Sequence, residues 1–326
     1  MTTNPLLKVR DLAVEFQMPE GVTQAVDNIS YNVNRGETVA IVGESGSGKS
    51  VSALAVMGLL QSPPASVSGE IIFQDRNLSQ FDEESLRKIR GHGIGMVFQE
   101  PMTSLNPVLS IETQLSEGMQ THLGFTSKQA HRRAVELLDK VGISEPERRL
   151  KQYPHHFSGG MRQRVMIAIA LACKPKLIIA DEPTTALDVT IQAQILQLMK
   201  DITVEFGVSL VLITHDLGVV ARYATRVNVM YAGRIVESGD TIDLFREPRH
   251  PYTLGLLSSV PRIDQDRSKR LVAINGQPPD LTKLDRGCSF YPRCNFAIND
   301  CSMIRPELVQ VSHDHGTACI CSDQLP

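Results

Sequence analysis

The fold is decided by one stretch of sequence, Gly43-Glu44-Ser45-Gly46-Ser47-Gly48-Lys49-Ser50. An apolar run at 38–42 precedes it, and residues 51–60, which contain no proline, follow it. This order predicts a strand, a glycine-rich turn and a helix with the spacing G-x-x-x-x-G-K-[ST]. Such a turn presents consecutive N–H groups to an anion, and the helix adds the positive end of its dipole. Glycine-rich turns also close ordinary strand–helix units, but this context predicts a nucleotide-phosphate site.

Two side chains of the loop have predicted roles. Lys49 is placed to reach the β- and γ-phosphates of a nucleotide, and the Ser50 hydroxyl to ligate Mg²⁺. The turn itself, which we expect to surround the phosphates, is formed by Gly43, Ser45, Gly46 and Gly48.

The composition limits the functions that need to be considered. A length of 326 residues suggests about two domains. The formal net charge of −3 gives no reason to expect nucleic acid as a partner. The longest apolar run, Val165 to Cys173, is too short to span a bilayer, and residues 1–12 lack the pattern of a secretory signal. Five of the six cysteines lie from Cys288 onward, where a cytosolic chain would not normally form disulfides.

The pattern along the chain alternates strands with helices. Continuous apolar runs at 38–42, 176–180 and 209–214 predict buried strands of a mostly parallel sheet with helices on both faces. Alternating residues at 6–16, with a slip near Arg10-Asp11, predict a strand that forms a hairpin with 25–33. Residues 111–153 are helical in pattern, with Thr126 or Ser127 as a cap. Further short elements are predicted at 69–73, 82–90, 93–98, 191–204, 227–231 and 234–238.

Two further segments carry residues suited to phosphate chemistry. Asp181 ends an apolar strand, where its carboxylate can hold Mg²⁺, and Glu182 can polarise a water for in-line attack. Ser158-Gly159-Gly160 precedes an apolar helix and offers N–H groups, a hydroxyl and a helix dipole to a phosphate. Each segment also has a plain structural explanation, because Asp181 and Ser158 are both good helix N-caps.

The order of these motifs resembles the ATP-binding-cassette ATPase subunit of a membrane transporter. The resemblance spans residues 6–260 and also includes Gln99, Ala186-Leu187-Asp188 and His215. It implies an α/β fold, a P-loop ATPase with a mixed sheet core, an antiparallel β subdomain and a helical subdomain. The implied boundaries are 1–255 for the ATP-binding domain, with the helical subdomain at about 105–160. A small, loop-rich, cysteine-containing C-terminal extension follows at 256–326.

The resemblance implies that ATP lies between two cassettes packed head to tail. The signature sequence of one subunit would grip the γ-phosphate on the other, and its matching residues here are Ser158, Gly159, Gly160 and Gln163. Met161 stands where many cassettes carry glutamine, which leaves the backbone contacts of the signature unaffected. Asp188 resembles the aspartate that crosses the dimer interface. Phe16 resembles the aromatic residue that stacks on adenine, with a core phenylalanine as the alternative.

The same resemblance assigns the catalytic groups. Glu182 corresponds to the general base, and His215 to the histidine that contacts the γ-phosphate. Gln99 resembles the loop glutamine that touches the metal and the attacking water and reports to the membrane subunit. Ser50, Gln99 and Asp181 are therefore expected to organise Mg²⁺.

Two flanking segments narrow the family. Residues 97–107 and 249–253 resemble the di- and oligopeptide importer ATPases, most closely the dipeptide importer subunit that pairs with a second, homologous ATPase. The implied partners are that ATPase or a second copy of this chain, two transmembrane permeases, and an extracytoplasmic peptide-binding protein that acts through them. The implied location is peripheral, at the cytoplasmic face of the bacterial inner membrane. Related importers take up nickel, glutathione or antimicrobial peptides.

The tail has the cysteine spacing Cys288-x5-Cys294-x6-Cys301, followed by Cys319 and Cys321. Thiolates are soft ligands, so an iron–sulfur cluster or zinc could occupy such a site, although the spacing suits zinc poorly. Similar importer subunits bind a [4Fe–4S] cluster, and this resemblance favours the first four cysteines as ligands, with Cys321 as the spare. Unliganded thiols are the alternative. The histidines at 313 and 315 fit zinc ligands but are more simply explained as surface residues.

A rival class is a soluble cassette ATPase of DNA repair or translation. Such proteins often carry two cassettes or long insertions, whereas one cassette and no basic stripe are present here. A degenerate cassette that binds ATP without hydrolysis is disfavoured because Lys49, Asp181, Glu182 and His215 are all present.

Overall fold

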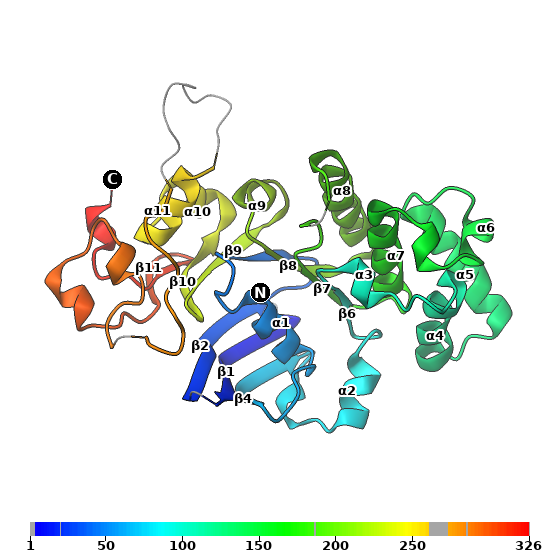
Figure 1. Ribbon diagram of the computed structural model, residues 1–326, viewed down its shortest axis with the longest axis horizontal. Coiled ribbons are helices and arrows are strands. Elements are labelled where there is room, and N and C mark those ends of the chain that lie inside the picture. The colour runs from blue at the N-terminus through cyan, green and yellow to red at the C-terminus, as the bar shows by residue number, and fades with distance from the viewer. Residues whose placement is uncertain (1–3, 20, 186, 261–272, 285, 326) are drawn as a thin grey trace. The chain divides into compact units, whose positions relative to one another are not determined.

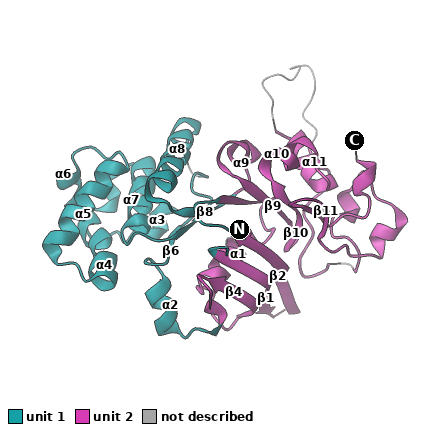
Figure 2. Ribbon diagram, turned by 180° about the vertical axis from the view of Figure 1, so that it is seen from behind, with its two compact units in different colours: residues 1–6, 33–37, 80–213 teal, residues 7–32, 38–79, 214–326 magenta. Residues whose placement is uncertain are grey.

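A computed structural model describes residues 4–19, 21–185, 187–260, 273–284 and 286–325 (Figure 1). The chain divides into two compact units (Figure 2). Unit 1 comprises residues 1–6, 33–37 and 80–213, and unit 2 comprises residues 7–32, 38–79 and 214–326. In the described part of the chain, every helix is too short or too polar to cross a membrane.

Unit 1 is built on three parallel strands in the order β8-β7-β6. These are β6 (Ile94–Val97), β7 (Leu177–Asp181) and β8 (Ser209–Thr214). Every residue of β7 and β8 is buried, as expected for parallel strands covered on both faces. Helices α7 (Gly159–Leu171) and α8 (Val189–Phe206) belong to the same unit. The three strands and both helices confirm the predicted pattern.

The helical part of unit 1 contains α3 (Pro101–Ser104), α4 (Ile111–Leu123), α5 (Ser127–Lys140) and α6 (Pro146–Leu150). Thr126 caps α5 in a capping box with Gln129, and the face of α5 that carries Ala130, Ala134, Leu137 and Leu138 is buried. Helix α2 (Glu83–Ile89) is capped by Asp82, with acidic residues in its first turn and basic ones in its last. The charged residues of α2 complement its helix dipole, and α5 has a local cap and an apolar face. Both helices could therefore be predicted from nearby residues alone.

The N-terminal part of unit 2 is an antiparallel sheet in the order β2-β1-β4-β5. Its strands are β1 (Leu7–Met18), β2 (Gly21–Val33), β4 (Ala65–Phe73) and β5 (Arg76–Asn77). The predicted slip near Arg10-Asp11 is confirmed, because the register of β1 on β4 shifts between Arg10 and Ala13. Gly69 lies opposite this shift with φ 96°, and a Cβ there would collide with the Asp11 carbonyl oxygen.

The second sheet of unit 2 has the order β11-β12-β10-β9-β3. Strand β3 (Thr38–Val42) runs parallel to β9 (Arg226–Tyr231), and β9 forms the predicted antiparallel hairpin with β10 (Arg234–Asp240). The C-terminal extension adds the hairpin of β11 (Val309–Ser312) and β12 (His315–Thr317), which was not predicted from the sequence. The helices of this unit are α1 (Lys49–Val56), α9 (Leu217–Tyr223), α10 (Thr241–Arg246) and α11 (Pro251–Ser258).

The C-terminal extension packs on the core of unit 2 through aromatic rings. Phe290 lies with its ring centroid 5.2 Å from that of Tyr231 and 5.4 Å from that of Tyr252, and the two tyrosine rings are 4.6 Å apart. All three side chains are buried. Edge-to-face and tilted aromatic pairs of this kind add to the free energy of simple burial. A segment with little apolar content of its own therefore shares the core of the preceding elements.

Candidate nucleotide site and cysteine cavity

The predicted strand, turn and helix around the phosphate loop are confirmed in unit 2, although α1 ends at Val56 rather than near residue 60. Gly48 is the N-cap of α1 with φ 98°, so no side chain caps the helix, and its first turn carries no acidic residue. A Cβ at Gly48 would collide with the Ala25 carbonyl oxygen. The backbone at the N-terminus of α1 therefore requires a glycine, and the uncapped N–H groups there favour a negatively charged ligand.

Lys49 lies inside the turn. Its side chain is buried, and its Nζ donates hydrogen bonds to the carbonyl oxygens of Gly43 at 2.8 Å and Glu44 at 2.9 Å. Burying an ammonium group costs free energy unless its N–H donors form hydrogen bonds, and here two loop carbonyls accept them. The loop therefore places a fixed positive charge beside the N–H groups of the helix start. Ser50 follows Lys49 in the first turn of α1, and Ser45 and Gly46 complete the turn.

In unit 1 the structure brings Gln99 and Glu182 together. Gln99 Nε2 donates to Glu182 Oε2 at 3.3 Å, and Thr185 Oγ1 donates to the same oxygen at 2.8 Å. Glu182 has φ 44°, the left-handed region that non-glycine residues rarely adopt. Its N–H donates to the Ile213 carbonyl oxygen at 2.9 Å. The buried Asp181 ends β7 directly before this turn.

The signature residues form the start of α7 in unit 1. Ser158 is the N-cap, and its Oγ accepts a hydrogen bond from the Met161 N–H at 3.4 Å. A Cβ at Gly160 would come within 2.7 Å of Ile191 Cγ2, so α7 and α8 approach closely here. Gln163 is buried, and its Nε2 has no hydrogen-bond partner among the described residues. Ser158 and Gly159 themselves are exposed.

Three other predicted residues have simple placements. Asp188 caps α8 by accepting from the Ile191 N–H at 3.0 Å and is exposed. His215 follows β8 and is exposed, and Asp216 after it caps α9. Phe16 is half-buried in β1 opposite Ala65. The Ala186 of the predicted motif lies outside the described residues.

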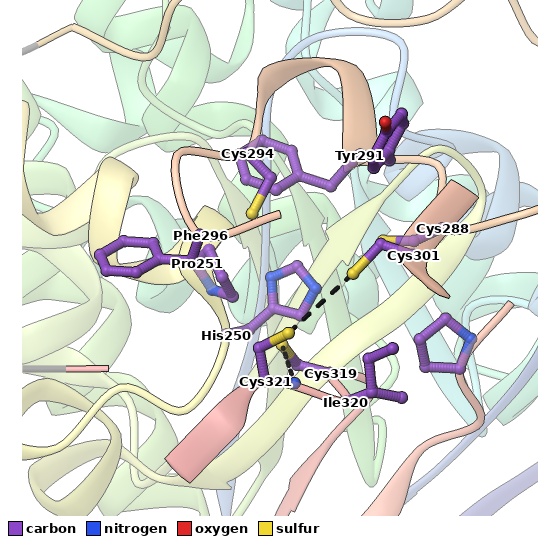
Figure 3. Close-up of a pocket in the computed structure, with 12 residues that line it drawn as sticks. His250, Pro251, Cys288, Tyr291, Cys294, Phe296, Cys301, Cys319, Ile320 and Cys321 are labelled. Carbon is purple, nitrogen blue, oxygen red and sulfur yellow. Dashed lines mark hydrogen bonds between the residues drawn. The ribbon is translucent and has the colours of Figure 1, made fainter. Parts of the chain in front are cut away.

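All five tail cysteines line one small cavity of about 10 Å³ in unit 2 (Figure 3). The Sγ atoms of Cys301 and Cys321 are 4.0 Å apart, and the Cys321 N–H points to Cys319 Sγ at 3.3 Å. Burial raises the pKa of the Cys294 thiol to about 11 and that of Cys319 to about 12. Cys321, which was not among the four predicted ligands, is 2% exposed. Its burial therefore gives no reason to distinguish it from those four cysteines.

The donors of the cavity suit a soft metal or a cluster, because five thiols and the His250 ring line it without a carboxylate. Over the described residues, however, no group of three or more histidine, cysteine, aspartate or glutamate side chains has an arrangement that could hold a metal ion. Burial lowers the pKa of His250 to about 3, and its Nδ1 accepts from the Tyr252 N–H at 3.1 Å. His250 therefore serves as a neutral, structural side chain here.

The expectation of a surface location was wrong for His315. It is buried, and its Nε2 lies 2.8 Å from Oε1 of the fully buried Glu237. The Glu237 carboxylate also accepts from the N–H groups of Arg249 at 2.6 Å and His250 at 3.0 Å. His313, in contrast, has a side chain that is 95% exposed. Glu237 and His315 were missed because their pairing depends on the unpredicted β11–β12 hairpin.

The chain matches known families over two stretches. Residues 26–185 match the ABC transporter family, and residues 236–301 match the C-terminal region of oligopeptide/dipeptide transporters. The oligopeptide transport ATP-binding protein AppD of Bacillus subtilis is 52% identical over 317 residues, which cover 97% of this chain and 96% of the relative. The oligopeptide transport ATP-binding protein OppD of Haemophilus influenzae is 49% identical over 316 residues, or 97% of each chain.

Solved structures agree with this match. A dimeric ATP-binding cassette in a post-hydrolysis state, bound to ADP and Pi, is 31% identical with a TM-score of 0.65, and the match covers 72% of this chain and 98% of that one. This chain therefore belongs to the ABC transporter family, within its group of oligopeptide and dipeptide transport ATP-binding proteins. The predicted fold class, a P-loop α/β ATPase with a mixed sheet and an additional antiparallel sheet, is confirmed.

Proposed function

We propose that this chain hydrolyses ATP as one of the two nucleotide-binding subunits of a membrane importer for di- and oligopeptides. The observation that carries the proposal is the phosphate loop, in which the buried Lys49 ammonium is fixed by two loop carbonyls beside an N-terminus without a side-chain cap. Relatives named for oligopeptide transport, matched over nearly the whole chain, support the choice of transport and of peptide.

Each predicted residue keeps a role in this proposal. Lys49 and the N–H groups at the start of α1 bind the phosphates, and His215 supports the transferring phosphoryl group. Glu182 takes the proton of the attacking water, while Gln99, its hydrogen-bond partner, orients that water. Magnesium, held by Ser50, Gln99 and Asp181, would neutralise charge on the phosphate oxygens. Phe16 is the candidate for stacking on adenine.

The exposed signature serine and glycine suggest that the second half of each ATP site comes from another subunit. Ser158, Gly159 and Gly160 of one subunit would contact the γ-phosphate bound by its partner, and Asp188 would lie at the interface between them. The buried Gln163 would support this signature from within α7. The dimeric cassette that this chain resembles supports such an arrangement. The partner is a second copy of this chain or a homologous ATPase. Two permeases and an extracytoplasmic binding protein complete the complex, with this subunit peripheral at the cytoplasmic face of the inner membrane.

The test is the ATPase rate of the complex assembled with two permeases and an extracytoplasmic binding protein. A peptide-loaded binding protein should raise the rate above that of the complex with an unloaded one. Stimulation by nickel- or glutathione-loaded binding protein instead would reassign the substrate. ATP hydrolysis by the isolated chain without any response in the complex would overturn the transport assignment and favour a soluble cassette ATPase.

For the tail we propose a [4Fe–4S] cluster bound by Cys288, Cys294, Cys301 and Cys319. The convergence of the tail thiols on one cavity supports this, and the cluster would supply stabilisation to a segment with few apolar residues of its own. Anaerobic purification followed by iron, sulfide and zinc analysis tests the assignment. We expect about four irons and four sulfides per chain, and zinc without iron would overturn the cluster in favour of a zinc site.

A further inference from the structure

One residue of the phosphate loop is held from outside the loop by the C-terminal extension. Glu44 receives both terminal nitrogens of Arg293, with Nη1 at 2.6 Å from Oε2 and Nη2 at 3.0 Å from Oε1. This is a parallel, two-bond arrangement, the strongest geometry for a guanidinium and a carboxylate. Arg293 is almost fully buried, with a side chain that is 5% exposed. Both residues belong to unit 2.

Arg293 is itself fixed by the extension. It ends a short 3-10 turn (Tyr291–Arg293) directly before Cys294, and its Nε donates to the Asn275 carbonyl oxygen at 2.9 Å. Its Nη1 lies 3.4 Å from the Tyr231 hydroxyl, and its Nη2 lies 3.4 Å from the Gly276 carbonyl oxygen. These hydrogen bonds restrain the Arg293 guanidinium, so it cannot move together with the Glu44 carboxylate. It therefore fixes the position of the Glu44 side chain.

The backbone of Glu44 is engaged as well. Its N–H donates to the hydroxyl of Tyr252 at 2.8 Å, and its carbonyl oxygen accepts from Lys49 Nζ. Glu44 thus contacts Arg293 through its side chain, Tyr252 through its N–H and Lys49 through its carbonyl oxygen. Any displacement of Glu44 would shift an acceptor that holds the Lys49 ammonium.

The pair also sets the charge beside the loop. The Glu44 carboxylate, 27% exposed, is a negative group in the turn that we expect to bind phosphate. Arg293 neutralises it at contact distance. Without the guanidinium, the loop would present an uncompensated carboxylate to an anionic ligand, and like charges disfavour each other strongly where water is partly excluded.

We propose that Arg293 of the C-terminal extension and Tyr252 of α11 are positioning residues of the nucleotide site, which together set the ATP affinity of the phosphate loop. This inference rests on the proposed function, because it requires the loop to bind ATP. Neither residue touches the reacting atoms in this scheme. Their effect falls on nucleotide binding, while the rate of the chemical step, which depends on Glu182, stays unchanged.

The test is an equilibrium titration of the full-length chain with a fluorescent ATP analogue, together with KM and kcat for ATP. Arg293→Met should raise the dissociation constant and KM by about 5- to 150-fold, the range of coupling between linked sites, with kcat within about twofold. Arg293→Lys should recover part of the loss, because an ammonium restores the charge without the two-bond geometry. Arg246→Met, which removes an exposed arginine of α10, is the matched control.

Two further variants separate positioning from general stability. Glu44→Gln/Arg293→Met removes the unpaired carboxylate while keeping both backbone bonds, so its ATP affinity should return towards that of the unmodified chain. Tyr252→Phe removes only the hydroxyl and should weaken binding severalfold even if Arg293→Met fails to fold. Unchanged affinity in both Tyr252→Phe and a folded Arg293→Met would overturn the inference. Failure of the unmodified chain to bind ATP would instead overturn the proposed function.

Discussion

The buried carboxylate of Glu237 offers the sharpest test of how the C-terminal extension is attached. Three donors meet it: Arg249 N–H and His315 Nε2 at one oxygen, and His250 N–H at the other. In Glu237→Gln, the amide oxygen can serve the first two donors, but the amide nitrogen then faces the His250 N–H. A buried donor without an acceptor costs about 1–3 kcal/mol, so we expect that loss in the stability of this region.

A larger perturbation should have a proportionally larger effect. Glu237→Leu leaves all three donors without an acceptor, at a cost of about 3–9 kcal/mol. That is comparable with the whole stability of a typical domain, about 5–15 kcal/mol, so the β11–β12 hairpin should detach from β10. Amide hydrogen exchange is the suitable assay, because it reports local opening in a chain of two units. The readout is the exchange rate of the amides of Arg249, His250 and Thr317.

The matched control is Glu247→Gln, which changes a mostly exposed carboxylate two residues before Arg249 and should alter exchange very little. If Glu237→Gln left the exchange rates of Arg249 and His250 within twofold of the unmodified chain, the reasoning would be refuted. Such a result would mean that the buried bonds from the Arg249 and His250 N–H groups to Glu237 contribute little to the stability of this region.

Three further perturbations test other parts of the structure. Lys49→Met should keep the loop folded, because it replaces a buried ammonium by an apolar chain. It should weaken ATP binding by at least about 10²-fold, because the charge-assisted bonds to the phosphates are lost. A fluorescent-nucleotide titration measures this affinity, and an unchanged value would contradict the prediction. Thr126→Ala should lower the stability of the helical part of unit 1 by about 1 kcal/mol, because the helix cap is lost. Urea unfolding followed by the circular-dichroism signal of the helices measures this, and an unshifted unfolding curve would contradict it. Cys319→Ser should abolish iron binding whereas Cys321→Ser should retain it; iron analysis giving the reverse would make Cys321 the fourth ligand.

The elements most accurately predicted from the sequence are those with local causes. The phosphate loop, the helix cap predicted at Thr126 or Ser127 and the slip at Arg10-Asp11 each depend on residues within a few positions of one another. Each appears in the structure, with Thr126 as the cap. The buried strands β7 and β8 were equally clear, because a short run of apolar residues closed by polar ones leaves few alternatives.

The contacts that were missed join residues far apart in the sequence. Arg293 meets Glu44 across 249 positions, and His315 meets Glu237 across 78. No local pattern marks such pairs, and a loop-rich segment gives no hydrophobic period from which its packing can be predicted. A weak signal did exist at 309–312, where Val and polar residues alternate, but all four residues of β11 are exposed, so no buried face reinforced it.

The most direct test of the central claim is the behaviour of Glu182→Gln. The glutamine keeps the size and hydrogen-bonding reach of the side chain but cannot take a proton from the attacking water. We predict ATP affinity close to that of the unmodified chain and steady-state hydrolysis reduced at least about 10²-fold. Size-exclusion chromatography should show an ATP-dependent dimer, formed with a second copy of this chain or with the homologous ATPase. The exposed Glu147→Gln should hydrolyse ATP normally. Normal steady-state hydrolysis by Glu182→Gln would contradict the assignment.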